Sequence, residues 1–241
     1  MRLATVFSMA AVAFASPTPS ELKSRASVPH DSLNPIATRV QAGNIGRAIE
    51  KFSPLLHIAH GCQPYTAVDD EGNTSGGLQD SGNVSAGCRD QAKGQLYARA
   101  AAHKEKFAIM YAWYFPKDQP AAGNVVGGHR HDWESVVVWI DNPDNENAVI
   151  LGGAASGHGE FNTTTTPNKQ DNNLLVEYFT TFPTNHELQF TSTVGKAYAI
   201  SDWDAMPTAA QKALSNGDTF GSANVPFMPD NFVNNLDKAF V

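Results

Sequence analysis

The segment Phe107-Ala-Ile-Met-Tyr-Ala-Trp-Tyr-Phe115 has an apolar or aromatic residue at every position. Successive side chains of an extended strand point to opposite faces, so both faces of a strand formed here are apolar. Such a strand is buried on both sides and lies in the middle of a layered structure. The segment therefore predicts a central strand with packing on each face of its sheet.

A second apolar run, Ser135-Val-Val-Val-Trp-Ile140, is rich in β-branched residues and predicts another buried strand. The 19 Gly and 14 Pro residues favour strands joined by turns over a helical bundle. We expect one domain over residues 31–241, mainly β with peripheral helices (α+β), built as a β-sandwich. Further strands are expected at 54–59, 148–155 and 174–179, and helices at 39–51, 204–215 (with Asp204 as N-cap) and 230–240; residues 95–102 fit either.

The N-terminus has the features of a secretory signal peptide over residues 1–15. Arg2 precedes an apolar stretch, and Ala13-Phe14-Ala15 supplies the pattern of small residues at a cleavage site. Residues 16–30 are rich in Pro and Ser and predict a flexible leader or pro-segment. The alternative is a buried N-terminal helix. A signal peptide implies a secreted, extracellular protein.

Two cysteines, Cys62 and Cys88, are the only ones in the chain. Secretion exposes them to an oxidising compartment, so a disulfide between them is expected, and two free thiols are the alternative. Asn73, Asn83 and Asn162 each begin a glycosylation sequon.

The formal net charge is −7. Phosphate binding needs a basic surface, so this charge argues against nucleic acid as a partner. It also argues against adhesion to anionic lipid by charge alone.

Ionisable residues concentrate in Gly127-Gly-His-Arg-His-Asp-Trp-Glu134, directly before the second apolar strand. In an extended backbone Asp132 and Glu134 share a face, about 6.5–7 Å apart. Two such carboxylates repel unless a positive group lies between them, and Arg130 or a metal ion would serve. Asp118, at the end of the preceding strand, would join them if the chain returns as a hairpin. Oxygen ligands select hard cations such as Ca²⁺ or Mg²⁺. The plain alternative is a charged strand end.

The heptapeptide Gly128–Glu134 resembles, letter for letter, that of the necrosis- and ethylene-inducing peptide 1-like (NPP1-type) proteins. These are secreted cytolytic toxins of plant-associated microbes. The segment 108–120 resembles the family's other signature, and the resemblance runs from about Pro54 to the C-terminus. It implies a β-sandwich similar to that of the actinoporins of sea anemones and of fungal lectins.

The resemblance also implies a site. A divalent cation, Ca²⁺ or Mg²⁺, would be surrounded by four residues, with Asp118 and Glu134 binding directly and His129 and Asp132 completing the shell. Arg130, His131 and Trp133 would support the motif. The family's membrane-contacting loop usually carries Trp, and the matching residue here is Phe182. Residues expected to contact a sugar headgroup are Asp69, Asn73 and His186 by resemblance, together with the loop residue His158.

The resemblance and the residue patterns together leave three functions to weigh, the first of which is implied by the resemblance. The first is a secreted cytolysin, not an enzyme, which would bind the glycosyl inositol phosphoryl ceramide headgroups of plant plasma-membrane sphingolipids through the cation. It would then enter the outer leaflet and permeabilise eudicot cells. The second is a non-toxic, lectin-like secreted protein using the same pocket. The third is a cupin-like metalloenzyme with a transition metal on His129, His131 and Glu134. In a regular strand the two His point away from Glu134, which counts against the third.

Overall fold

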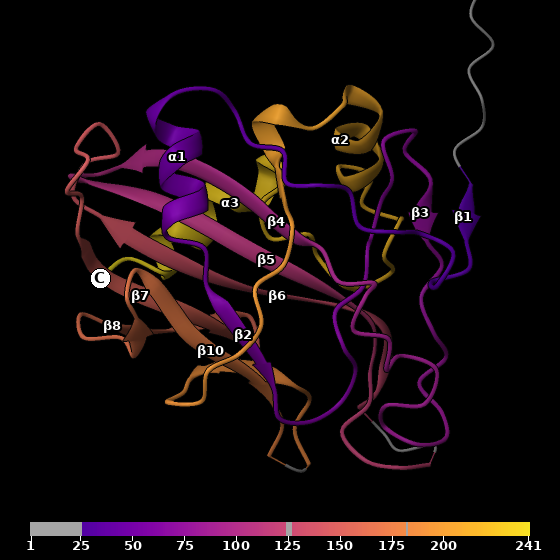
Figure 1. The fold of residues 1–241 in the computed structure, drawn as a ribbon. Coiled ribbons are helices and arrows are strands. Elements are labelled where there is room, and N and C mark those ends of the chain that lie inside the picture. Colours follow the sequence, from indigo (N-terminus) through magenta and orange to yellow (C-terminus); the bar gives the residue numbers. More distant parts are fainter. Residues whose placement is uncertain (1–25, 124–126, 182) are drawn as a thin grey trace, which may run out of the picture.

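The computed structural model describes residues 26–123, 127–181 and 183–241 (Figure 1). The predicted signal peptide, residues 16–25 of the predicted leader, and Phe182 lie outside these ranges. Of residues 26–30, Ser27–Val28 forms β1, which pairs in parallel with β3 (Thr74–Ser75).

A six-stranded sheet forms the centre of the molecule, with the strand order β12-β4-β5-β6-β7-β8. β12 runs parallel to β4, and the other neighbours are antiparallel. The strands are β4 (Leu96–His103), β5 (Lys106–Asp118), β6 (His129–Ile140), β7 (Ile150–Gly157), β8 (Glu160–Thr164) and β12 (Ile200–Asp202).

The two central strands contain the two apolar runs identified in the sequence. β5 and β6 pair from Phe107 opposite Ile140 to Asp118 opposite His129. Both runs are buried throughout, which confirms the prediction of strands packed on both faces. The strands extend beyond the apolar runs, because their ladder continues through the polar residues at one end.

A smaller sheet covers one face of the central sheet. It contains β2 (Leu55–Ile58), β10 (Asn173–Phe179) and β11 (Glu187–Phe190), and β9 (Lys169–Gln170) pairs with β10. Phe115 of β5 stacks on Tyr178 of β10 with ring centroids 3.8 Å apart. The helix α1 (Asn44–Lys51) lies on the same face, where the Tyr111 hydroxyl donates to the Ile49 carbonyl at 2.7 Å. In Figure 1, α1, β2 and β10 lie in front of the large sheet.

The opposite face is covered by the C-terminal part of the chain. Trp139 Nε1 donates to the Ala239 carbonyl just after α3 (Pro229–Lys238) at 2.8 Å, and Tyr97 stacks on Phe227. The helix α3 lies behind the large sheet in Figure 1. The prediction of a mainly β sandwich with few, peripheral helices is confirmed. No helix among the described residues has the length and apolar character needed to cross a membrane.

Several predicted boundaries were wrong. The expected helix 204–215 is two elements, the 3₁₀ turn Trp203–Ala205 and α2 (Thr208–Leu214), separated around Pro207. Asp204 is not its N-cap: the side chain of Asp202 accepts a hydrogen bond from the Asp204 N–H, and Pro207 precedes α2. The first helix begins at Asn44 and not at residue 39. The segment 95–102, which the sequence left open between helix and strand, lies almost entirely in strand β4.

Candidate functional site

The heptapeptide lies inside strand β6 and pairs with the end of β5. His131 has a left-handed backbone, with φ of 62°, which is uncommon for a residue other than Gly. The side-chain alternation of a regular strand is therefore interrupted at His131. Beyond this point the alternation holds, and Asp132 and Glu134 line one cavity. The side chain of Arg130 does not line this cavity, whereas that of His129 does.

Asp118, His129 and Asp132 form a compact group, with one ligand atom from each lying within 4.8 Å of the others. His129 Nε2 is 3.7 Å from Asp118 Oδ2. Asp118 accepts hydrogen bonds from the backbone N–H of His186 at 3.0 Å and from its ring Nδ1 at 2.5 Å. Tyr178 donates its hydroxyl proton to Asp132 Oδ2 at 2.8 Å. Neighbouring donors thus fix both carboxylates, and the three ligand atoms could hold a metal ion.

Electrostatics favour a cation at this point. Burial, reinforced by the charge of Asp118, raises the pKa of Asp132 to about 7. Burial and the charge of Asp132 raise the pKa of Glu134 well above its usual value. Each ionised carboxylate is therefore unfavourable beside the others, and a cation among them would relieve this repulsion. The residues present fit a hard divalent cation, since two carboxylates supply oxygen ligands.

Glu134 lines the same cavity but is not one of the three residues, Asp118, His129 and Asp132, whose ligand atoms lie close together. Its Oε2 accepts a hydrogen bond from the hydroxyl of Ser156, and Ser156 Oγ accepts one from the Ser135 N–H at 2.8 Å. Glu134 and Ser156 both line the same cavity as the group. Direct coordination by Glu134 therefore stays a prediction, as do the roles of the other ligands.

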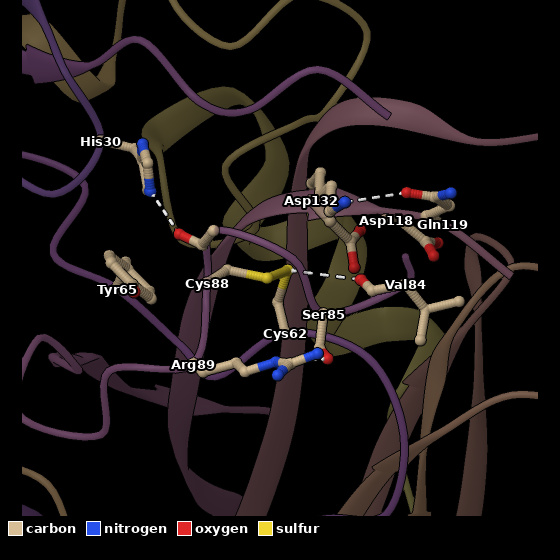
Figure 2. The surroundings of a disulfide bond; sticks show 12 residues. His30, Cys62, Tyr65, Val84, Ser85, Cys88, Arg89, Asp118, Gln119 and Asp132 are labelled. Carbon is tan, nitrogen blue, oxygen red and sulfur yellow. Dashed lines mark hydrogen bonds between the residues drawn. A yellow bond between two sulfur atoms is a disulfide. The ribbon is translucent and has the colours of Figure 1, made fainter. Parts of the chain in front are cut away.

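The loop closed by the disulfide supports the neighbouring end of β5. Cys62 and Cys88 are bonded, and the alternative of two free thiols was wrong for this structure (Figure 2). The buried ammonium of Lys117 donates to the carbonyl oxygens of Ser81 and Asn83, at 3.1 and 2.9 Å, and to Gln119 Oε1 at 2.8 Å. Asp118 lies between the buried residues Lys117 and Gln119 in sequence. The same end of β5 therefore contacts the disulfide-closed loop and carries one member of the acidic group.

A cavity of about 760 Å³ opens over the group. His186 and His158 both line it, and their contact with a sugar headgroup stays a prediction. His158 lies in the turn between β7 and β8, where its Nε2 is 3.6 Å from Glu187 Oε1. Sequence reasoning missed Tyr178 and Ser156, because an isolated hydroxyl in an apolar strand or beside a Gly gives no signal of its own.

The structure does not bring Asp69 and Asn73 to this cavity. They close a turn beside β3, where Asn73 Nδ2 donates to Asp69 Oδ2 at 2.8 Å and the Asn73 N–H donates to Asp69 Oδ1 at 2.8 Å. Arg130 is also elsewhere: it donates to the Gly76 carbonyl at 2.8 Å and to Gln79 Oε1 at 3.1 Å.

The cupin-like ligand set is not assembled. His131 Nδ1 lies 2.7 Å from the Tyr114 hydroxyl, and its ring packs edge-on against Phe220, on the side of the sheet opposite Asp132. Trp133 packs on that same side, against Tyr97 and Phe227. Both side chains therefore lie on the face away from the acidic group, and their support of the motif stays a prediction.

Comparison with known proteins matches residues 46–239 to the family model described as necrosis inducing protein (NPP1). The chain belongs to this family. The Phytophthora capsici protein "NLP effector protein 2" is 41% identical over 219 residues, covering 89% of this chain and 87% of that protein. The resemblance seen in the heptapeptide is thus confirmed over most of this chain.

Solved structures agree in fold. One described as "Toxin fold as basis for microbial attack and plant defense" is 42% identical, with a TM-score of 0.84 over 90% of this chain and all of that one. The protein NLPPya in complex with mannosamine is 41% identical with a TM-score of 0.83, again over 90% and 100% of the chains. A third, described as the non-toxic HaNLP3 protein, is 39% identical with a TM-score of 0.82, over 88% and 98%.

Proposed function

We propose that the protein is a secreted cytolysin that binds sugar headgroups of plant plasma-membrane sphingolipids and permeabilises eudicot cells. The group Asp118, His129 and Asp132, at the base of a large cavity, carries this proposal. Together with Glu134 it would hold a divalent cation, Ca²⁺ or Mg²⁺. When bound, the cation supplies positive charge and open coordination positions that suit sugar hydroxyls.

The chain's own residues give the site its shape. His186 and Tyr178 donate to Asp118 and Asp132 and hold the carboxylate oxygens toward one another. His158 and His186 line the cavity and would contact the headgroup. The related protein NLPPya has been solved with mannosamine and with glucosamine, which supports a sugar as the ligand class.

Membrane damage would follow docking. Phe182 is proposed to enter the outer leaflet, since its position matches the family's membrane-contacting aromatic. With a net charge of −7, attachment would come from recognition of the headgroup and not from general attraction to anionic lipid. The disulfide and the family membership support an extracellular site of action.

A second candidate is a secreted, sugar-binding protein without toxicity. The structure described as non-toxic HaNLP3 favours keeping it, because that protein is 39% identical to this chain and has the same fold. A toxin and a non-toxic relative can therefore differ without a change of architecture.

One experiment separates the two. Purified protein is applied to eudicot leaves and to vesicles containing glycosyl inositol phosphoryl ceramide, with and without a chelator. Lysis that the chelator abolishes supports the cytolysin, whereas chelator-sensitive binding without lysis supports the lectin-like protein. Absence of vesicle binding in Ca²⁺ and in Mg²⁺ would contradict both, and turnover of a small molecule would point to an enzyme.

A further inference from the structure

The cavity over the acidic group continues to the other side of the central sheet. Its lining includes Asp132 and Glu134 from one face of β6 and Trp133 from the other. This is possible because the backbone pairing of β7 with β6 begins only at Val136, opposite Ala155; before it β6 is reached by the side chain of Ser156, which accepts from the Ser135 N–H. The far compartment is bounded by α3 and by the segment that precedes it.

Side-chain amides line this far compartment: Asn224, Asn231, Asn234 and Asn235 all border the cavity. Asn231 Nδ2 donates to the Val225 carbonyl and Asn235 Nδ2 to the Pro226 carbonyl, each at 3.0 Å. Each bond uses one of the two N–H donors of its amide. Within the described ranges no donor binds their Oδ1 atoms, so each amide keeps an oxygen acceptor available.

Charged residues add further acceptors. Glu160 and Asp237 also line the cavity. Asp237 Oδ1 is held by Lys104 Nζ at 3.0 Å and by His103 Nε2 at 3.1 Å, and its Oδ2 binds no donor among the described residues. The nearby ammonium of Lys238 is already engaged by the Gly159 carbonyl at 2.6 Å and by Glu160 Oε1 at 3.3 Å. A surface rich in acceptors favours a ligand that carries donors, such as hydroxyl or amino groups, and disfavours phosphate. Phe161, half-buried in the same lining, adds an apolar surface of the kind that ligand pockets combine with a few polar groups.

We propose that this compartment, defined by Asn224, Asn231, Asn234 and Asn235, is a second sugar subsite. It takes a further hydroxyl-bearing or amino-bearing sugar of a headgroup whose first sugar lies at the acidic group. The cavity volume of about 760 Å³ lies in the range of pockets for drug-sized ligands, larger than one sugar ring requires. This inference rests on the proposed function, because the first sugar must bind at the acidic group.

The test uses Asn234→Ala, with Asn224→Ala as a second variant. Asn234 is exposed on α3 and its amide reaches only the Asp230 carbonyl, at 3.3 Å, so Ala at this position keeps the helix. The probes are glucosamine and a panel of glucosamine-terminated disaccharides of different linkage, titrated by calorimetry in Mg²⁺. At least one disaccharide should bind wild-type protein about tenfold more tightly than glucosamine, and each variant should reduce that advantage several-fold with glucosamine affinity unchanged.

Three results would overturn the subsite. In the first, no disaccharide binds more tightly than glucosamine; in the second, the variants retain the full advantage; in the third, they weaken the binding of glucosamine and disaccharides equally. Failure of the proposed function gives a different pattern, in which wild-type protein binds neither glucosamine nor any disaccharide, and the subsite then falls with it. Melting temperatures of both variants, expected to match wild type, show that the comparison is between folded proteins.

Discussion

Asp118 and His186 are both buried and are joined twice, through the backbone N–H of His186 and through its ring Nδ1. Because a carboxylate can only accept these bonds, the ring proton must sit on Nδ1. His186 Nε2 has no hydrogen-bond partner among the described residues. The ring also stacks on Tyr178, whose hydroxyl binds Asp132, so one pair of stacked rings orients both carboxylates.

His186→Leu should therefore weaken cation binding while leaving all predicted ligands in place. Loss of a partner that orients a metal ligand typically costs about 10–100-fold in affinity. Calorimetry with Ca²⁺ and Mg²⁺ measures the effect. His186→Asn, which keeps a side-chain donor near the position of Nδ1, should recover part of the affinity. Wild-type affinity in the Leu variant would contradict this orienting role.

The acidic group should make the metal-free protein sensitive to pH. The pKa of Asp132 is raised to about 7 by burial and by Asp118, whereas in the unfolded chain it is about 3.9. The folded state thus binds the proton more tightly, so this group's contribution to stability is lost as pH rises from about 4 to 7. Asp132→Asn should remove this loss, as measured by thermal melts in chelator.

His131 acts in the opposite direction over the same range. Burial, with the charges of Arg130 and His129, lowers its pKa to about 4, so its contribution to stability is lost as pH falls from about 6.5 toward 4. The effect of Asp132 on stability is therefore measured as the difference in melting temperature between Asp132→Asn and wild type at each pH. The contribution of His131 is present in both proteins and cancels in this difference. Identical pH profiles of the two proteins would contradict the assignment.

The disulfide should contribute strongly to stability. It joins residues 26 apart in sequence, and the chain-entropy relation gives about 3–4 kcal/mol for a loop of this size. Replacing Cys62 and Cys88 together by Ser should lower the free energy of unfolding by about this amount in chemical denaturation. Thiol titration of denatured, unreduced protein should find no free thiol, and two free thiols would refute the bond in the purified protein.

The apolar segments made the central strands predictable, whereas the detailed site depended on one backbone feature. Period-two alternation places Arg130 with Asp132 and Glu134. The left-handed His131 interrupts that alternation, so Arg130 binds the Gly76 carbonyl and His129 joins the acidic group instead. Nothing local in the sequence requires a His to adopt this backbone, because the Tyr114 hydroxyl that holds its ring comes from the neighbouring strand.

The elements that were missed share a different cause. β8 and β9 are short, polar and largely exposed, so no apolar periodicity marks them, and β12 depends on parallel pairing with β4 about a hundred residues earlier in the chain. The position of the hydrogen-bonded pair Asp69 and Asn73 relative to the cavity was also not predictable from the local sequence. Their spacing is local, but whether they face the cavity is decided by long-range packing.

Glu134→Ala should leave a folded protein that no longer damages eudicot cells. Glu134 is buried with a raised pKa, so its charge does not stabilise the metal-free fold, and removing it relieves repulsion with Asp132. Among the described residues its one side-chain hydrogen bond is with Ser156, whose hydroxyl keeps the Ser135 N–H as a partner. Asp132→Ala should act in the same way. The loss is expected in ion leakage from leaf tissue and in cation binding, with the melting temperature of the metal-free protein changed little.

Val137→Ala is the matched control on the same strand. Val137 is fully buried and lies beyond the heptapeptide, so its truncation should cost about 0.5–3 kcal/mol of stability and leave cation affinity at the wild-type value. Opposite effects of the two substitutions would separate the site from the scaffold within β6. Full leakage activity in Glu134→Ala would contradict the cation-dependent headgroup site. Failure of that variant to fold would mean that Glu134 is structural, and the same leakage test on Asp132→Asn would then decide whether the acidic group acts in toxicity.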